Sequence, residues 1–270
     1  MHIQSETKES LLIWQINRPE RRNALGTILS QELWEKTQQL RKNLKDWQDL
    51  PGDSPLPIRV LAIKAAPTTA DKAPIWIAGG DLKELSELKT AAEGRKYAET
   101  MALVCNALYD LPIPVVVLID GLVIGGGIEF ALAADFRFIT QRSQFHFKQL
   151  ELGLATAYGS AQRLTQLVGV SKAMDWLLRS KRVTAEAALQ SGLVHEVLDR
   201  MEDLEDELAE FVDQIKRLPP RGVAAQKRML HADGIDPKRT QMELDIFESL
   251  WMKDYHQNRL NDFLKNSNSV

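Results

Sequence analysis

Residues 121–129 read GLVIGGGIE, and only Asp120 separates them from the longest strongly apolar run of the chain, residues 113–119. A short run rich in Val and Ile that stops at a glycine is typical of a buried strand. Glycine has no Cβ, so its backbone N–H can approach a ligand closely, and it adopts positive φ angles freely. The stretch therefore predicts a strand, a tight glycine turn and a helix, with a backbone N–H of the turn presented to a ligand.

A second glycine turn has the same organisation. Residues 75–82 read IWIAGGDL, which predicts a short strand, a turn at Gly79-Gly80 and a helix that opens near Asp81. In parallel α/β sheets, ligands collect beyond the carboxyl ends of the strands. Two N–H groups aimed at one point form an oxyanion hole, and loss of one such donor costs a factor of about 10² to 10³ in rate.

Two other interpretations of these glycines have to be weighed. Either motif alone is compatible with a tight turn that has no chemical role. A nucleotide-binding loop is the rival functional interpretation, but the glycines at 121 and 125–127 do not have the Rossmann spacing, and the chain contains no GxxxxGK[ST] sequence. The oxyanion hole remains the functional interpretation that these turns favour.

Glu129 follows the triple glycine within an otherwise apolar stretch, residues 128–134. A buried carboxylate is costly without partners, and burial raises its pKa. A raised pKa suits a general acid/base that works near neutral pH. The alternative is a solvent-facing glutamate on a half-buried helix.

The rest of the chain alternates strands and helices and then becomes helical. We predict strands at residues 11–16, 58–63, 75–77, 113–119 and 136–139, and helices at residues 25–40, 91–109 and 129–134. Beyond Gly159 the apolar spacing predicts helices at residues 161–167, 171–178, 185–190, 204–218, 221–230 and 237–264. Such alternation indicates a largely parallel sheet, here followed by a helical C-terminal region.

Composition narrows the classes of function. The 270 residues are 44% hydrophobic and 26% charged, with a formal net charge of -3, so nothing points to a nucleic-acid or membrane-surface partner. The single cysteine, Cys105, lies in an apolar helical stretch and is expected to be a buried structural thiol. The polar N-terminal sequence and the shortness of the apolar runs lead us to expect a soluble, cytoplasmic protein.

Along nearly its full length the sequence resembles the crotonase (enoyl-CoA hydratase/isomerase) superfamily. Each matching piece is modestly specific, but the order and spacing of the pieces together are highly specific. The matching pieces are residues 16–25, 78–82 and 121–129, then Phe145, Gly153 and residues 162–164, and finally residues 185–187, 192–194 and Val197.

The resemblance implies an α/β fold, a spiral of β-β-α turns with a helical C-terminal region used in trimerisation. Residues 1–200 would form the spiral core, and residues 201–270 the region for assembly and closure of the CoA site. The implied assembly is a homotrimer or a dimer of trimers. The implied partner is an acyl-CoA thioester substrate, with no nucleic acid, no membrane, no metal and no cofactor, because coenzyme A is part of the substrate.

The resemblance also implies roles for individual residues. The thioester carbonyl would bind between the N–H groups of Gly80 and Gly126, which would stabilise an enolate, with Glu129 as acid/base. The remaining implied substrate-binding residues lie along the CoA path, and they are Ala24, Ala78, Asp81 and Leu82, with Lys265 as the basic residue nearest the CoA phosphates. The alternative for Lys265 is a solvated surface lysine.

The chain departs from the family pattern at two positions. Hydratases of the family use a second glutamate after Phe145, and that position falls on Gln149, which cannot exchange a proton as a carboxylate does. Glu151 lies two places further on and need not reach the same point. Tyr158 is bulky where the family's hydratases have a small residue, so it would reshape the acyl pocket or simply pack in the core.

Two basic residues beside the same position, His146 and Lys148, are weaker candidates for substrate contact. The sequence thus predicts an enzyme, with an enoyl-CoA hydratase-like lyase as the default. Within the same family, a short-chain acyl-CoA decarboxylase of the methylmalonyl or ethylmalonyl type, an enoyl-CoA isomerase and a thioester hydrolase remain open. An alternative of another class is a non-catalytic acyl-CoA-binding protein, and a dinucleotide oxidoreductase is disfavoured.

Overall fold

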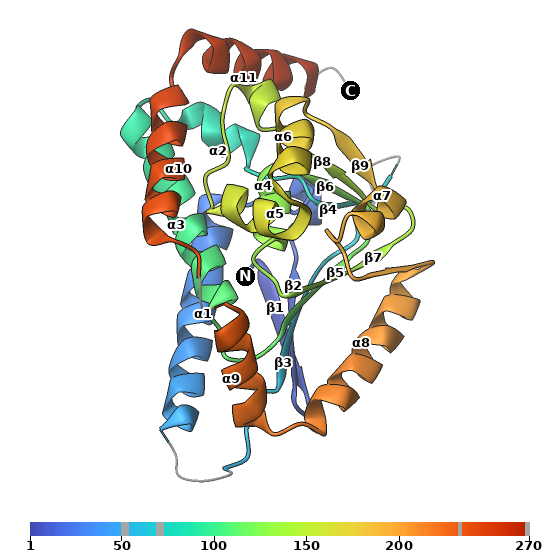
Figure 1. The fold of residues 1–270 in the computed structure, drawn as a ribbon. Coiled ribbons are helices and arrows are strands. Elements are labelled where there is room, and N and C mark those ends of the chain that lie inside the picture. The colour runs from blue at the N-terminus through green and yellow to red at the C-terminus, as the bar shows by residue number, and fades with distance from the viewer. Residues whose placement is uncertain (50–53, 69–72, 232–233, 268–270) are drawn as a thin grey trace.

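The structure is a computed structural model that describes residues 1–49, 54–68, 73–231 and 234–267 (Figure 1). Its strands are β1 (Ile3–Lys8), β2 (Leu11–Ile16), β3 (Val60–Ala65), β4 (Ile75–Ile77), β5 (Val115–Ile119), β6 (Leu122–Ile124), β7 (Phe136–Thr140), β8 (Gln144–His146), β9 (Arg182–Thr184) and β10 (Glu196–Leu198). Its α-helices are α1 (Thr27–Gln48), α2 (Leu82–Glu87), α3 (Ala91–Tyr109), α4 (Gly126–Ala131), α5 (Ser160–Val168), α6 (Val170–Leu178), α7 (Ala185–Gln190), α8 (Met201–Lys216), α9 (Pro220–Leu230), α10 (Pro237–Leu250) and α11 (Asp254–Ser267). Short 3₁₀ helices occur at η1 (Pro19–Arg21) and η2 (Leu150–Leu152).

The strands form two sheets that the chain visits alternately. Within the described residues, the larger sheet has the order β1-β2-β3-β5-β7-β10 and the smaller sheet the order β4-β6-β8-β9. Three times in succession a strand of the larger sheet is followed by a strand of the smaller one, as β3-β4, β5-β6 and β7-β8. The pairs β3·β5, β5·β7, β4·β6 and β6·β8 are all parallel. This repetition confirms the predicted spiral of β-β-α turns.

The centre of the larger sheet is buried on both faces, which explains why β5 is apolar throughout. Val116 and Leu118 belong to a cluster with Leu204, Leu208 and Val212 of α8. The alternate residues of β5 belong to the main core, into which α1 and α3 pack from the other face. Figure 1 shows α8 on one side of this sheet and α1 with α3 on the other. The central strands of the larger sheet therefore lie between two helical layers.

The C-terminal helices differ from the sequence-based expectation. One helix over residues 237–264 was predicted, and this is wrong, because α10 ends at Leu250 and α11 begins at Asp254. The chain turns at Met252, whose φ is 62°, and the Trp251 side chain is buried. Burial of that indole stops the helix, so the polar helix that follows starts in a new direction. The apolar spacing alone carries no sign of this break.

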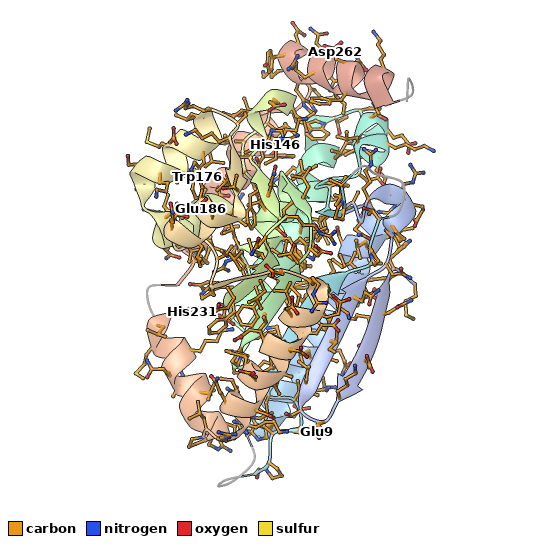
Figure 2. The ribbon with its side chains drawn as sticks, turned by 90° about the vertical axis from the view of Figure 1, so that its right-hand side faces the viewer. Glu9, His146, Trp176, Glu186, His231 and Asp262 are labelled. Atoms are coloured by element: carbon orange, nitrogen blue, oxygen red, sulfur yellow. The ribbon has the colours of Figure 1, made fainter. Side chains whose placement is uncertain are left out.

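α11 lies across one end of the molecule, above α2 and η2 (Figure 1). It is held there by polar contacts: His256 Nδ1 lies 2.7 Å from Leu152 O, and Arg259 Nε donates to Glu151 O at 3.0 Å. In Figure 2, His146 lies toward this end and Glu9 at the opposite end. None of the helices in the described ranges has the length and apolar character needed to cross a bilayer.

Candidate active site

The two glycine turns meet and line one cavity. The first follows β4 and the second follows β6, and these strands are parallel neighbours. A Cβ on Gly79, whose φ is +89°, would lie 2.9 Å from Ile124 O and 3.2 Å from Gly126 N. The turns are therefore in backbone contact, and a side chain at this position would push them apart.

Two backbone N–H groups at this contact are available to a ligand. Gly80 and Gly126 both line the cavity. In the part of the chain that the structure describes, neither N–H donates to an acceptor of the protein. Both glycines are only partly buried, and Gly126 begins α4, where the first N–H groups have no acceptor within the helix, so the two N–H groups are free to bind a ligand in the cavity. They can receive one oxygen of a bound ligand, as an oxyanion hole requires.

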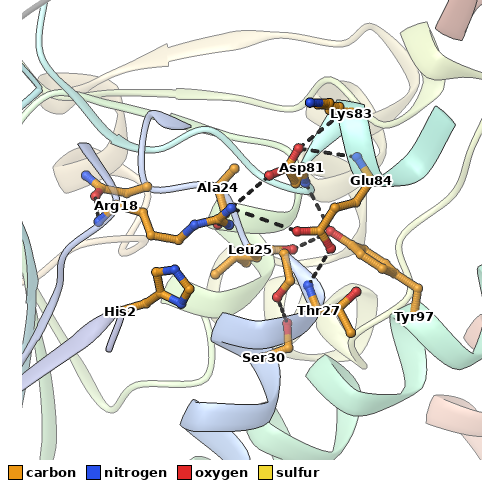
Figure 3. A network of polar contacts seen from close by, with 12 residues as sticks. His2, Arg18, Ala24, Leu25, Thr27, Ser30, Asp81, Lys83, Glu84 and Tyr97 are labelled. Carbon is orange, nitrogen blue, oxygen red and sulfur yellow. Dashed lines mark hydrogen bonds and ion pairs between the residues drawn. The ribbon is translucent and has the colours of Figure 1, made fainter. Parts of the chain in front are cut away.

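The first turn is fixed from behind by a buried polar network (Figure 3). Asp81 caps α2, and its Oδ2 lies 3.1 Å from Nη2 of buried Arg18, which also lies 3.8 Å from Glu84 Oε1. The Tyr97 hydroxyl accepts from Asp81 N at 3.0 Å and donates to Leu25 O. These contacts hold Asp81, the residue directly after Gly80, in place. They therefore limit the directions in which the Gly80 N–H can point.

Glu129 points into the same cavity and is 4% exposed. Its Oε2 accepts from Ala157 N at 2.9 Å, from Tyr158 N at 3.0 Å and from the Ser160 hydroxyl at 2.8 Å. Its Oε1 accepts from Gln149 Nε2 at 3.1 Å. Four donors thus fix the orientation of this carboxyl group.

The pKa of Glu129 results from two opposed effects. Burial raises it above the ordinary value for a glutamate, and the hydrogen bonds from the backbone, Gln149 and Ser160 act in the opposite direction. Burial prevails, so Glu129 takes up a proton more readily than an exposed glutamate. Burial likewise raises the pKa of the Tyr158 hydroxyl, which keeps that phenol protonated.

Gln149 and Tyr158 limit the reactions that the site around Glu129 can support. Gln149 lines the cavity, and among the described residues its Oε1 has no hydrogen-bond partner. The Tyr158 ring packs against the second turn, because a Cβ on Gly126 would lie 3.1 Å from Tyr158 Cε2 and 3.2 Å from its hydroxyl. A tyrosine here reduces the space beside the N–H groups of Gly80 and Gly126. The site thus combines one carboxyl group with one carboxamide.

The far wall of the cavity comes from the C-terminal helices of the same chain. Phe247 on α10 and Phe263 on α11 line it, and Lys148 Nζ lies 4.5 Å from the centroid of the Phe263 ring. Sequence reasoning missed Phe247 and Phe263, because both lie on amphipathic helices where a phenylalanine indicates only core packing. Tyr97 and Arg22 also line the cavity and carried no local signal either.

The structure brings most of the expected site residues together. The cavity is lined by Ala78, Gly80, Leu82, Gly126, Glu129, Gln149 and Tyr158. Asp81 lies behind the first turn as the cap of α2, and Ala24 is buried, with its carbonyl accepting from Arg18 Nη1 at 2.8 Å. Lys265 lies on α11 with an exposed side chain.

Of the weaker candidates, Lys148 lines the cavity, whereas His146 Nε2 contacts Glu151 Oε1 at 3.2 Å. Cys105 is fully buried, and burial raises its thiol pKa to about 12, so the prediction of a buried structural thiol is confirmed. A thiol that stays protonated at neutral pH is a poor nucleophile.

The sequence matches known proteins over most of its length. Residues 67–268 match the enoyl-CoA hydratase/isomerase family. A Mycobacterium tuberculosis protein named "probable enoyl-CoA hydratase echA6" is 31% identical over 243 residues, which cover 90% of this chain and 88% of that protein. An ethylmalonyl-CoA decarboxylase of Bos taurus is 27% identical over 240 residues, which cover 87% of this chain and 72% of that protein.

Solved structures show the same fold. An enoyl-CoA hydratase from Bacillus halodurans superimposes with a TM-score of 0.84 at 20% identity, covering 97% of this chain and 100% of that one. A methylmalonyl-CoA decarboxylase in complex with 2-nitronate-propionyl-CoA gives a TM-score of 0.80 at 20% identity, covering 98% of this chain and 96% of that one. At these identities the likeness concerns the fold alone.

Proposed function

The chain belongs to the enoyl-CoA hydratase/isomerase family, and we propose that it is an acyl-CoA-processing enzyme that stabilises a thioester enolate. The N–H groups of Gly80 and Gly126 would receive the thioester oxygen, on which negative charge develops as the enolate forms. Both donors line the cavity beside Glu129, the acid/base candidate. Donors preorganised toward developing charge lower the barrier because they need no rearrangement during the reaction.

Among reactions that pass through such an enolate, decarboxylation of a short malonyl-type acyl-CoA has the strongest support. The observation that carries it is Gln149, which donates to Glu129 at 3.1 Å at the position where efficient water addition would use a second carboxylate. In decarboxylation the bond between Cα and the carboxylate carbon breaks, its electron pair forms the enolate, and CO₂ leaves. Cα then takes one proton, which Glu129 can deliver because burial raises its pKa.

Hydration of an enoyl-CoA is the second candidate. It is favoured by Oε1 of Gln149, which is buried beside the cavity and has no partner among the described residues, so it could accept a hydrogen bond from an attacking water. Glu129 would then have to act as the only proton carrier. A single carboxyl group gives a slower hydration than two, because the proton removed from water and the proton added to Cα would share one group.

The experiment that separates the candidates is a substrate panel. Purified protein is incubated with methylmalonyl-CoA, ethylmalonyl-CoA, crotonyl-CoA and a 3-enoyl-CoA. We expect CO₂ release from one or both malonyl-type thioesters. Loss of the conjugated-enoyl absorbance of crotonyl-CoA without CO₂ release would assign hydration instead, and gain of that absorbance from the 3-enoyl-CoA would assign isomerisation. Release of free CoA would assign hydrolysis, and binding without turnover would assign a non-catalytic role.

The acid/base assignment is tested on the substrate that is turned over. Glu129→Gln keeps the size of the side chain but removes the titrating group, so we expect kcat to fall by about 10² to 10⁴. Binding of the acyl-CoA should change little, because the oxyanion donors are retained. Full activity of Glu129→Gln would show that another group moves the proton.

The oligomeric state, the cellular compartment and the roles of the two regions of the chain are part of the same proposal. A homotrimer or a dimer of trimers is expected from the family, with residues 201–270 taking part, and light scattering after size-exclusion chromatography tests it. The proposed reaction needs no cofactor, since it uses only an oxyanion hole and a proton carrier. The cytoplasm is the proposed compartment, which fits the free thiol of Cys105.

A further inference from the structure

A second buried carboxyl group lies behind Glu129, on a helix from the far end of the sequence. Glu243, on α10, is 5% exposed. Its Oε2 accepts from Ser160 N and its Oε1 from Ala161 N, each at 3.1 Å. Ser160 also donates its hydroxyl to Glu129 Oε2 at 2.8 Å. A single residue, Ser160, is thus hydrogen-bonded to both buried carboxyl groups.

Glu243 supplies the hydrogen-bond acceptors that the N-terminus of α5 lacks in its own sequence. The first N–H groups of a helix need acceptors, which a side chain at the N-cap usually supplies. The N-cap of α5 is Gly159, which has no side chain, and its φ is +71°. A Cβ there would lie 3.0 Å from Thr240 Oγ1 on α10. The start of α5 therefore packs closely against α10, and Glu243 of α10 accepts hydrogen bonds from its first N–H groups.

The same segment carries the donors that hold the catalytic carboxyl. The N–H groups of Ala157 and Tyr158 and the hydroxyl of Ser160 all bind Glu129 Oε2. These residues precede or begin α5, so the orientation of Glu129 depends on where α5 starts. That start is fixed by Glu243. A displacement of Glu243 would move three of the four donors to Glu129.

The charges around Glu243 come from three elements. Those that act on it or respond to it are Glu129 on α4, Arg163 on α5 and Cys105 on α3. Arg163 donates to Tyr158 O at 2.6 Å and to Asn106 Oδ1, so its guanidinium is engaged next to Glu243 rather than with it. Burial first, and the negative charge of Glu129 second, raise the pKa of Glu243 to about 7.

We propose that Glu243 is a positioning residue that holds the Ser160 end of α5 and sets the charge environment of Glu129. This inference rests on the proposed role of Glu129 in catalysis. Ionised Glu243 binds the two N–H groups of α5 most strongly, but it also disfavours a second negative charge on Glu129. Gain or loss of one proton on Glu243 therefore changes both the hold on α5 and the proton affinity of Glu129.

The test compares Glu243→Gln with a matched control on the same helix. Glu248→Gln removes an α10 carboxylate that pairs with Arg95 at 2.8 Å, away from Ser160. For Glu243→Gln we expect kcat to fall roughly 10-fold to 100-fold, because the acid/base is misplaced, while KM stays within about twofold. The kcat–pH profile of the native protein should inflect near pH 7, and this inflection should be absent in Glu243→Gln. Glu248→Gln should keep the native kcat, KM and profile.

A second readout does not depend on any reaction. Protein labelled with ¹³C at the glutamate carboxyl carbon is titrated by NMR. One carboxyl of the native protein should titrate near pH 7, be lost in Glu243→Gln and persist in Ser160→Ala. The pKa of Glu129 should change little in Glu243→Gln, because Glu243 is still protonated and neutral where Glu129 ionises.

The two readouts separate the possible failures. If every glutamate of the native protein titrates below about pH 5.5, or if Glu243→Gln keeps the native pH profile and titration, the inference is overturned. If no acyl-CoA is turned over, the proposed function fails while the titration still decides the coupling. If Glu243→Gln does not fold, the titrations of the native protein and of Ser160→Ala still decide the outcome.

Discussion

Glu129 and Gln149 meet at 3.1 Å across the cavity, and the chemistry of the site depends on this contact. A carboxylate accepts a hydrogen bond from a carboxamide without competition for a proton, so Glu129 can stay oriented in either charge state. Two carboxyl groups at the same separation would share a proton and titrate as a pair. With glutamine at position 149, Glu129 therefore has a fixed hydrogen-bond donor beside it instead of a second group that could transfer protons.

Gln149→Glu should restore part of a hydratase site. The new carboxyl group gives the site two proton carriers, so we expect hydration of crotonyl-CoA to rise at least about tenfold and decarboxylation to fall. The variant should also be less stable, because a hydrogen bond is replaced by a pair of like acids. Both rates are measured on the same preparation, by enoyl absorbance and by CO₂ release.

Gln149→Leu is the control, since it removes the donor without adding a proton carrier. It should gain no hydration and should weaken decarboxylation, because Glu129 loses one of its four donors. An unchanged ratio of the two activities in Gln149→Glu would show that this position does not select the reaction.

Glu243 should make stability depend on pH in an unusual direction for a carboxyl group. Its pKa is raised from 4.5 to about 7 by burial and by Glu129. Between these values the folded protein holds a proton that the unfolded chain has lost. The contribution is therefore fully present below about pH 4.5 and is lost as pH rises to about 7, a difference of roughly 3 kcal/mol.

The measurement is the free energy of unfolding between pH 4.5 and 8, taken as the difference between the native protein and Glu243→Gln. His195 acts in the opposite direction, because burial and Arg137 lower its pKa to about 4. His195 is present in both proteins, so its effect cancels in the difference. A difference that stays constant over this pH range would mean that Glu243 is not the titrating group.

At the level of elements, the sequence predicts those helices and strands whose bounds are set by the local spacing of apolar residues. Helix α3 and strand β2 are found at the predicted bounds, because amphipathic spacing and a compact apolar run fix them locally. Strand β1 was missed, since its burial pattern is one buried residue followed by five exposed ones, which gives no alternation. The break between α10 and α11 was missed because its cause, a pocket for Trp251 on α3, lies about 150 residues away in the chain.

That pocket exists only because α3 has a glycine, Gly94, in its first turn. A Cβ on Gly94 would lie 2.4 Å from Trp251 Cδ2, so Gly94→Ala must displace the indole and the end of α10. Overpacking of this kind costs about 1 to 3 kcal/mol, although alanine alone is the better helix former. We expect a clear fall in Tm together with a fall in kcat, because α10 carries Glu243 and Phe247.

Gly222→Ala on α9 is the matched control, because a Cβ there would meet only Pro219 Cβ, at 3.7 Å. This substitution should leave activity unchanged and raise stability by up to about 1 kcal/mol. A Gly94→Ala protein as stable and active as Gly222→Ala would show that Trp251 is not packed against α3 in solution.

At the level of the whole molecule, the site is assembled from parts that no local pattern connects. The two glycine turns were found from sequence because each carries its own motif and because parallel strands align their ends. The walls added by Phe247 and Phe263, and Glu243 behind Glu129, were not found, since their helices reach the site only through the tertiary fold. The C-terminal region thus contributes to the candidate active-site cavity of its own chain.

This arrangement predicts that residues 1–200 and 201–270 do not unfold separately. The α8 side chains Leu204, Leu208 and Val212 complete the core on one face of the larger sheet, and Glu243 on α10 caps α5 of the spiral. Removing the C-terminal region would expose that apolar face and leave the first turn of α5 without its acceptors.

We therefore expect one cooperative transition, with equal calorimetric and van't Hoff enthalpies in scanning calorimetry. Hydrogen exchange should show α5 and α10 losing protection with the same dependence on denaturant, because each stabilises the other. Glu248→Gln, which alters only the surface pair with Arg95, should leave the two helices coupled, whereas Glu243→Gln should let α10 exchange at lower denaturant than α5. Two separate transitions in the native protein would mean that the boundary near residue 200 divides the chain into independently stable units and that Glu243 couples them only weakly.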